Sequence, residues 1–264
     1  MVEWWQDITR SILWKGPTCP MKEFIVGTND AGQRLDRWLA KTLPLLPAPL
    51  AQKYIRLKRV KLNGRGAKRD VRLVQGDLLQ LYINDEFFDN PREDNAYLTV
   101  ANPNLNIVYE DENILLADKP QGLLVHPDKN EYGDTLIARI QRYLYEKGEY
   151  RPEDENSFRP ALANRIDRNT GGIVIAAKNA EALRILCDKI KQRELEKRYL
   201  AVVHGTPEKK EATLEGFLEK NAEQNRVYLK TKKTDSALTI KTRYRVIESR
   251  NGLSLLDIAL LTGR

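Results

Sequence analysis

Short strand-like segments dominate the chain from residue 106 onward, and only two stretches there have the periodicity of a helix. Apolar residues that alternate predict strands, whereas apolar residues spaced three and four apart predict helices. Neighbouring strands joined by short turns are typical of antiparallel sheets. We therefore predict an α+β fold with a mainly antiparallel mixed sheet. The expected strands are 107–109, 114–117, 173–177, 198–204, 226–229, 238–247 and 253–260; the expected helices are 135–145 and one capped by Asn179, with Leu183, Leu186, Cys187 and Ile190 as its buried stripe.

The first third of the chain has a different pattern, with two short helices and a small β unit. Apolar residues at helical spacing predict a helix over 34–43, and a proline-rich stretch ends it. Pro49 can begin a second helix that runs to about Lys58. The expected strands here are 23–26, 60–62, 71–74 and 78–83. The predicted organisation is a leader over 1–20, a basic domain over 21–84, an acidic linker over 85–104 and a larger domain over 105–264.

The positive charge of the chain is concentrated in one segment. The whole chain carries a net charge of +7, and residues 53–72 contain nine basic residues and a single acid, Asp70. A run of charge is often only a solvated surface, but an excess confined to one segment favours a polyanionic partner. The cationic residues that we expect to contact such a partner are Arg34, Arg37, Lys53, Arg56, Lys58, Arg59 and Lys61.

The composition argues against several other classes. Two cysteines without a CxxC pair and two distant histidines predict neither a disulfide framework nor a structural metal. This cysteine usage suits a reducing cytoplasm. The sequence has no apolar run of the roughly 18 residues that a membrane span needs. Residues 1–20 do not resemble a signal peptide, and we expect the folded sequence to begin at Met21.

Two similar tetrapeptides stand in different contexts. Residues 34–37 read Arg-Leu-Asp-Arg inside an amphipathic helix, where Asp36 is best interpreted as a surface or capping acid. Residues 165–168 read Arg-Ile-Asp-Arg in a predicted loop, ahead of two glycines. An acid between arginines, next to glycines that allow close backbone approach, suits a site that admits a polyanion. From the local residues alone, a simple ion pair in a loop is the alternative.

Three segments of the basic domain resemble the αL RNA-binding domain, a module named for the fourth protein of the small ribosomal subunit. They are 34–39 (Arg-Leu-Asp-Arg-Trp-Leu), 55–64 (Ile-Arg-Leu-Lys-Arg-Val-Lys-Leu-Asn-Gly) and Gly76-Asp77. The resemblance implies that the basic helix face grips structured RNA through its phosphates and shape.

Residues 164–172 (Asn-Arg-Ile-Asp-Arg-Asn-Thr-Gly-Gly) resemble the catalytic motif of the RluA family of pseudouridine synthases, although Gly171 stands where serine is common. Residues 118–123 resemble the first motif of that family, and residues 196–205 resemble the segment that carries its tyrosine. The resemblance implies a catalytic domain over 105–264 that isomerises uridine in RNA. It assigns Asp167 as the acting carboxylate, Arg165 as the residue that helps displace the flipped base, and Tyr199 as the group that stacks on uracil and assists proton removal.

The same resemblance implies that the enzyme needs no metal, nucleotide or redox cofactor. The expected partner is RNA, with ribosomal RNA of the large subunit ahead of transfer RNA, and the complete domain is expected to be a monomer. The family normally continues beyond the segment that matches 261–264, where this sequence ends. The catalytic domain is therefore expected to be incomplete, and the chain weakly active or inactive. The alternative from another class is a non-catalytic RNA-binding protein; a protein–protein adaptor fits the local basic patch poorly.

Overall fold

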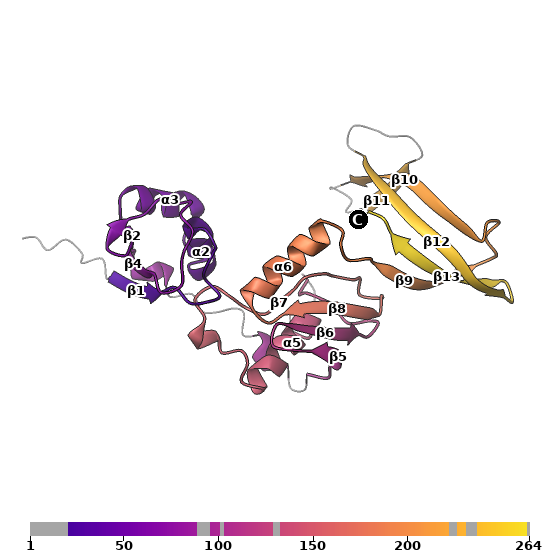
Figure 1. Cartoon of the computed structure of the whole chain (residues 1–264), viewed down its shortest axis with the longest axis horizontal. Helices are drawn as coiled ribbons and strands as arrows, with labels where there is room; N and C mark the ends of the chain where they lie inside the picture. Colours follow the sequence, from indigo (N-terminus) through magenta and orange to yellow (C-terminus); the bar gives the residue numbers. More distant parts are fainter. Residues whose placement is uncertain are drawn as a thin grey trace, which may run out of the picture. The chain divides into compact units, whose positions relative to one another are not determined.

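We analysed a computed structural model, which describes residues 21–88, 96–100, 103–128, 133–221, 226–230 and 237–262. The chain forms two compact units, of which the first ends at Cys187 and the second begins at Asp188. Figure 1 labels the helices and strands of both. Both contain antiparallel sheets, and helices accompany those of the first unit, so the predicted α+β class is confirmed. The predicted leader over 1–20 lies outside the described residues.

The basic lobe, residues 21–88, contains a four-stranded antiparallel sheet in the order β1-β4-β2-β3. Its core is built around the fully buried Trp38, which meets Phe24 edge to face at a centroid distance of 5.4 Å. Leucines spaced along the first helix join Trp38 on one face, as the periodicity predicted. The elements of the lobe are β1 (Met21–Ile25), α2 (Leu35–Thr42), α3 (Ala48–Arg56), β2 (Val60–Leu62), β3 (Arg65–Gly66), β4 (Leu78–Tyr82) and the 3-10 turn η1 (Asp85–Phe87).

The strand predicted over 71–74 is wrong. This segment forms only an isolated bridge between Arg72 and Arg34. The carbonyl of Val71 accepts from the backbone N–H of Leu35, and the N–H of Leu73 donates to the carbonyl of Gln33. The backbone groups of the segment therefore bond the entry of α2 instead of a ladder, which the apolar alternation alone did not reveal.

The remainder of the first unit is built on a second antiparallel sheet, in the order β5-β6-β8-β7, which we call the central sheet. Alternate residues of the inner strands are buried against α5, with Leu115, Ala117 and Val174 on the sheet and Ile140 on the helix. The hairpin, the helix and the strand predicted here are confirmed. The elements are α4 (Ala96–Thr99), β5 (Asn106–Glu110), β6 (Ile114–Lys119), α5 (Leu136–Glu146), the 3-10 turn η2 (Pro152–Asp154), β7 (Ala161–Leu162), β8 (Gly172–Ala177) and α6 (Ala180–Lys191), whose last four residues belong to the second unit.

The helix predicted after Asn179 is present, but its predicted stripe is not a buried core. Asn179 caps α6 by accepting from the backbone N–H of Ala182 at 2.8 Å. Only Ala182 of this helix is buried. Leu183, Leu186 and Ile190 are half-buried, and Cys187 is exposed. The predicted helical spacing is therefore correct, but periodicity does not show how deeply the apolar face of the helix is buried.

A buried carboxylate joins the basic lobe to the segment that precedes β7. Asp30 is 1% exposed and accepts hydrogen bonds from the Gly27 N–H (3.1 Å), Asn156 Nδ2 (2.7 Å) and Ser157 Oγ (2.5 Å). The side chain of Asn29 also accepts from the Ala180 N–H at 3.0 Å, at the start of α6. Because a buried carboxyl group needs such partners, these contacts join the loop after β1 to Asn156 and Ser157 and to the start of α6.

The second unit is a single five-stranded antiparallel sheet, in the order β11-β10-β12-β13-β9. The sequence predicted four of these strands and missed β10, which pairs with both β11 and β12. Glu211, Glu215 and Glu219 on one face of β10 and the central Gly216 on the other interrupt its apolar alternation. The strands are β9 (Arg198–His204), β10 (Glu211–Asn221), β11 (Arg226–Lys230), β12 (Leu238–Arg250) and β13 (Leu253–Leu260).

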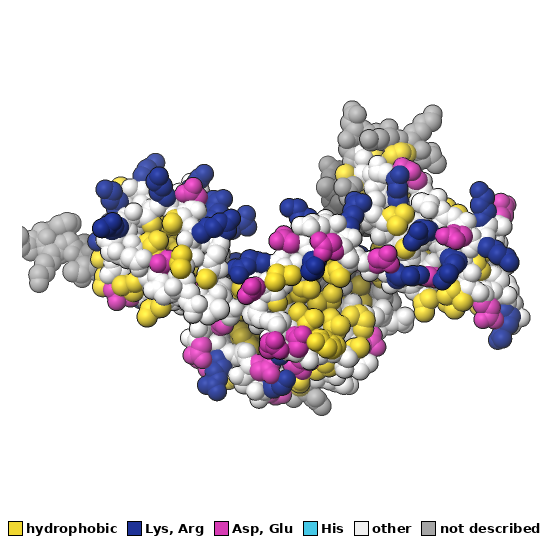
Figure 2. Space-filling view, viewed as in Figure 1, with side chains coloured by type: hydrophobic (Ala, Val, Ile, Leu, Met, Phe, Trp, Pro, Cys, Tyr) yellow, Lys and Arg dark blue, Asp and Glu magenta, His cyan; other side chains and the backbone are white. Residues whose placement is uncertain are grey.

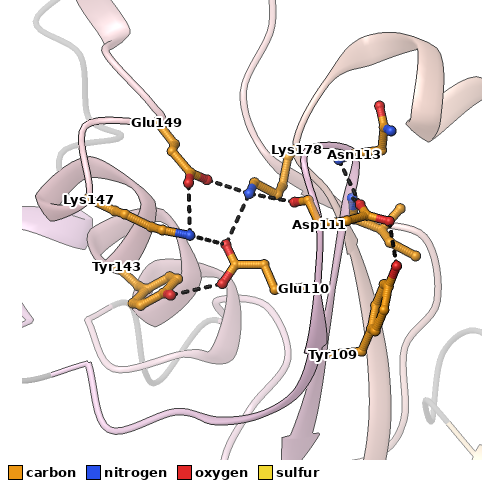
Figure 3. A network of polar contacts seen from close by, with 9 residues as sticks. Tyr109, Glu110, Asp111, Asn113, Tyr143, Lys147, Glu149 and Lys178 are labelled. Carbon is orange, nitrogen blue, oxygen red and sulfur yellow. Dashed lines mark hydrogen bonds and ion pairs between the residues drawn. The ribbon is translucent and has the colours of Figure 1, made fainter.

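An ion network ties the first hairpin of the central sheet to the end of α5 (Figure 3). Glu110 on β5 accepts from Lys147 at 2.9 Å, Lys178 at 3.0 Å and the Tyr143 hydroxyl at 2.8 Å. Glu149 pairs with both lysines as well. Burial by itself raises the pKa of Glu110, but the hydrogen bonds from Lys147, Lys178 and Tyr143 outweigh it and hold the pKa below 4.5. The network thus stabilises the ionised carboxylate.

We expect Glu110→Gln to lower the free energy of unfolding by about 1–3 kcal/mol at neutral pH, because charged hydrogen bonds in a half-buried network are lost. A carboxylate whose pKa is lowered by folding contributes stability above its unfolded value and loses it as the pH falls through its folded value. The difference from the parent should therefore shrink below about pH 4. Urea denaturation at neutral and acid pH measures it.

Glu146→Gln is the matched control, since Glu146 forms only an exposed pair with Arg142 one turn away on α5. It should cost no more than about 0.5 kcal/mol. A loss in Glu110→Gln that is independent of pH would contradict the electrostatic account.

Candidate active site

The site begins with a lysine that the strand alternation of β6 turns inward. Leu115, Ala117 and Lys119 are successive residues on the buried face of this strand, and Lys119 has no exposed surface. Lysine is rarely buried completely, because its ammonium must then find partners inside the protein. The buried ammonium group of Lys119 therefore needs hydrogen-bond acceptors from the surrounding loops.

Three backbone carbonyls surround the ammonium group of Lys119. Its Nζ donates to Leu123 at 2.8 Å, to Pro120 at 2.9 Å and to Arg168 at 3.0 Å. The first two carbonyls belong to the loop after β6, and the third belongs to the loop between β7 and β8. Two further bonds join the same loops: the Gly122 N–H donates to the Arg168 carbonyl at 2.8 Å, and Arg168 Nε donates to the Gly122 carbonyl at 2.9 Å. Three bonds to Arg168, one of them from Lys119, thus clamp the two loops together.

The loop over 163–171 is also fixed from its other side. The Asn164 side chain accepts from the Ile175 N–H at 2.8 Å and donates to the Ile173 carbonyl at 3.3 Å, so that it continues the ladder of β7 on β8. Ile166 packs against the core of the central sheet. Its neighbours Arg165 and Asp167 are exposed. The loop therefore anchors one apolar side chain and presents the acid and the arginine to solvent.

Asp167 has an exposed side chain. Its carboxylate makes no ion pair or side-chain hydrogen bond with any residue in the described part of the chain; only its backbone carbonyl is engaged, by the Thr170 N–H at 3.1 Å. The simple loop ion pair that the local sequence allowed is therefore not formed. By contrast, Asp36 in the similar tetrapeptide is held by Arg34, with Nε to Oδ1 at 3.0 Å. Asp36 is thus a half-buried acid that pairs with Arg34 in the first turn of α2.

The electrostatics of the site come from a few charges close to the loop. Burial lowers the pKa of Lys119, and the negative charge of Asp167 partly offsets that effect. Burial also lowers the pKa of His126, and the positive charge of Arg165 adds to the shift. Both effects favour the neutral form of His126.

The two glycines after the loop have different constraints. Gly172 has a φ of +128°, which strains any side chain, so this position requires glycine. A Cβ at Gly171 would lie 3.4 Å from the Lys119 carbonyl and 3.5 Å from Gln121 Cγ, which is ordinary contact. The site therefore leaves room for the serine that is common at this position in the family that the motif resembles.

The remaining predicted residue of the site, Tyr199, belongs to the second unit. It lies half-buried on β9, opposite Ile258 of β13. No side-chain hydrogen bond of Tyr199 occurs among the residues that are described. Asp167 and Arg165 are therefore brought together by one loop of the first unit, and Tyr199 is presented by a strand of the other unit.

A groove of about 680 Å³ in the basic lobe gathers part of the predicted RNA-contacting set. Lys53 and Arg56 line it from α3, and Lys58 lines it from the following turn. Lys68 and Arg69 complete its cationic wall, while Pro49, Ile55 and Ala67 supply apolar surface. Figure 2 shows Lys and Arg side chains gathered over α2 and α3 on this lobe.

The other predicted cations lie outside this groove. Arg34 is paired with Asp36. Arg59 and Lys61 lie over the rings of Tyr54 (5.3 Å) and Tyr82 (4.8 Å), and Arg37 is exposed on α2.

The sequence reasoning did not select Lys119, Lys68 or Arg69 as site residues. Lys119 could have been found from the alternation of β6, which places it on the face of Leu115 and Ala117. Among the described residues, no group of three or more His, Cys, Asp or Glu side chains could hold a metal. No described helix has the length and apolar character needed to cross a membrane.

An exposed carboxylate between arginines, on a clamped loop of an α+β fold, suits an enzyme that acts on a polyanion. The chain belongs to the RNA pseudouridylate synthase family, whose model matches residues 113–264, more than half of the sequence. Members are isomerases, and the expectation of an RNA pseudouridine synthase is confirmed at this level.

Two relatives illustrate the match. The chain is 32% identical over 247 residues to an uncharacterised RNA pseudouridine synthase of Mycoplasma genitalium, covering 92% of this chain and 75% of the relative. It is 28% identical over 243 residues to the ribosomal large subunit pseudouridine synthase D of Nitrosomonas europaea, covering 92% and 65%. A solved structure, human RNA pseudouridylate synthase domain containing 1, aligns with a TM-score of 0.49 at 19% identity over 61% of each chain.

Lys119→Met tests the clamp. The substitution keeps an apolar stem of similar length but leaves three carbonyls without their ammonium donor, and we expect a loss of about 2–4 kcal/mol of unfolding free energy. Amide exchange at Gly122, which donates to Arg168, should also become faster. Hydrogen exchange and urea denaturation measure the two effects. Lys189→Met, at an exposed lysine of α6, is the control; unchanged exchange at Gly122 in Lys119→Met would contradict the clamp.

Proposed function

We propose that this chain isomerises uridines of large-subunit ribosomal RNA, with Asp167 as the acting carboxylate. The observation that carries the proposal is that Asp167 is exposed, makes no ion pair within the described structure, and lies on a loop clamped by Lys119. The names of several relatives, ribosomal large subunit pseudouridine synthases C and D, support this substrate. Transfer RNA is the alternative substrate.

The proposed reaction breaks the bond between N1 of uracil and C1′ of ribose, rotates the base and joins C5 to C1′. The proton on C5 is released to solvent and N1 takes up a proton from solvent, so the product is an isomer of the substrate residue. The target base must first leave the RNA stack, which costs a few kcal/mol. An ionised carboxylate can act either as a nucleophile or as a base, and Asp167 is proposed to act at the sugar or at the base in one of these ways.

The proposed partners of Asp167 follow from the motif resemblance and from charge. Arg165, exposed on the same loop, is proposed to occupy the space that the flipped base leaves. Tyr199 is proposed to stack on the uracil and to assist removal of the proton from C5. A loop that is fixed before the substrate binds supports such chemistry, because a preorganised charge needs no rearrangement during the reaction.

The basic lobe is proposed to be an αL domain that holds the RNA. Five cationic side chains line one groove there, and none of the described residues that line it is aromatic. Such a surface favours contacts with phosphates and shape over the stacking of single bases.

Asp167→Ala should abolish isomerisation, since no other side chain of the loop can replace the carboxylate. Release of tritium from RNA labelled at C5 of uridine measures it. RNA affinity should change less than about twofold, because a negative charge is not a phosphate contact.

The chain offers a matched control in Asp36→Ala, the acid of the similar tetrapeptide, which should retain the parent activity. Equal tritium release by the parent and by Asp167→Ala would contradict the assignment. RNA binding without release by the parent would favour the non-catalytic RNA-binding alternative.

The double variant Lys53→Gln and Lys58→Gln should bind RNA more weakly than the parent, and its affinity should depend less on salt. Each lost phosphate contact lowers the slope of log affinity against log salt by about one, so the double variant should lose about two. Fluorescence anisotropy over a salt series measures the slope. Lys189→Gln, on α6 and paired with Glu194, removes an equivalent charge elsewhere and should leave the slope unchanged. An equal loss of slope in both would contradict the groove as the binding surface.

A further inference from the structure

Three arginines share one face of the sheet in the second unit. The register pairs Asp257 of β13 with Leu200 of β9 and with Arg245 of β12. These residues therefore lie in one row on one face. Arg198 and Arg243 stand two residues away along the same strands, and because side chains alternate across a strand they point to that face too. Figure 2 shows Lys and Arg side chains over this sheet, with acidic side chains among them.

Asp257 orients two of the three arginines. Its carboxylate accepts from Arg198, with Nε at 3.3 Å and a second bond from Nη2, and from Arg245 Nη2 at 3.3 Å. The Asp257 side chain is 13% exposed, whereas those of Arg198 and Arg245 are 56% and 63% exposed. One largely buried carboxylate thus orients two guanidinium groups, whose remaining N–H groups face solvent. Its single negative charge balances only one of their two positive charges.

Arg243 contributes the third guanidinium group. It is exposed, and no described residue forms an ion pair with it. Its partner across the ladder is Ala259, whose small side chain leaves the space between Arg243 and Arg198 open. The result is a hollow of about 210 Å³ lined by all three arginines, Asp257, Glu211, Tyr244 and Ala259.

The charges of the hollow match one particular ligand group. Three guanidinium groups and two carboxylates leave a single positive charge, which is the complement of one phosphodiester. Guanidinium groups bind phosphate oxygens through paired N–H donors, and Arg198 and Arg245 are already oriented by Asp257. An ordinary ion ladder would instead pair every cation, as Lys241 and Glu215 do at 3.0 Å on the same face.

We propose that the hollow formed by Arg198, Arg243 and Arg245 binds one backbone phosphate of the RNA substrate. The inference rests on the proposed function and adds a contact on the second unit. The described part of β9 has β13 as its one ladder neighbour, so β9 is an edge strand. Tyr199 points to the opposite face of this strand from Arg198. An RNA strand that crosses the edge of β9 can present one nucleotide to Tyr199 and a flanking phosphate to the hollow.

Arg243→Gln tests the proposal with little risk to the fold, because it breaks no ion pair and leaves Asp257 satisfied. The slope of log affinity against log salt should fall by about one, and RNA affinity at about 0.1 M salt should fall roughly threefold to tenfold. Fluorescence anisotropy with the full chain and a labelled ribosomal RNA fragment measures both, and circular dichroism checks the fold.

Lys241→Gln is the matched control, since it removes one charge from the same strand and face but from a cation already paired with Glu215. It should leave the slope unchanged. The proposal is overturned if the two variants behave alike, or if Arg243→Gln keeps the parent slope while Lys53→Gln with Lys58→Gln reduces it; in that last case the proposed function stands. Salt-independent binding by the parent chain would overturn both.

Discussion

The ammonium group of Lys119 is the interaction on which the geometry of the candidate site depends. A lysine without exposed surface has lost its water, and three backbone carbonyls within 3.0 Å replace it. Two of these carbonyls lie in the loop after β6 and the third in the loop of Asp167, so the two loops must close around one charge. If either loop moved away, a buried cation would lose an acceptor, which is costly in a low-dielectric interior. An exposed loop is thereby given a fixed conformation.

The chain uses its positive charges in three physically distinct ways. Lys119 is buried and satisfied by backbone carbonyls, and its role is to position the loop. Lys147 and Lys178 are paired with Glu110 and Glu149, so their charge is consumed in joining α5 to the central sheet. The cations of the basic lobe that line the groove face solvent, and they remain available to an anion. The net charge of the chain is therefore a poor guide to its partner until each cation has been assigned to one of these environments.

Much of the fold followed from local patterns, because the period of apolar residues reports which face of an element is covered. Strands β6, β8 and β9 and helices α3 and α5 were predicted in this way. The failures occurred where longer-range contacts decide: residues 71–74 bond the entry of α2, and the stripe of α6 is only partly covered. Lys119 was missed for a related reason. The alternation of β6 indicates that Lys119 is buried, but its acceptors are backbone carbonyls up to 49 positions away, which the sequence does not identify.

The two similar tetrapeptides differ because the backbone around each one directs its arginine side chains to different partners. Arg34 is the extended residue before α2, and this lets its guanidinium group fold back onto Asp36 two residues later, while Leu35 enters the core. In residues 165–168 the central apolar residue is again turned inward, since Ile166 packs on the central sheet. There, however, Arg168 is drawn away to the Gly122 carbonyl, and Arg165 lies without an ion pair in the described structure. Neither arginine neutralises Asp167. The clamp holds Arg168 at the Gly122 carbonyl, while the carboxylate of Asp167 stays exposed and without an ion pair among the described residues.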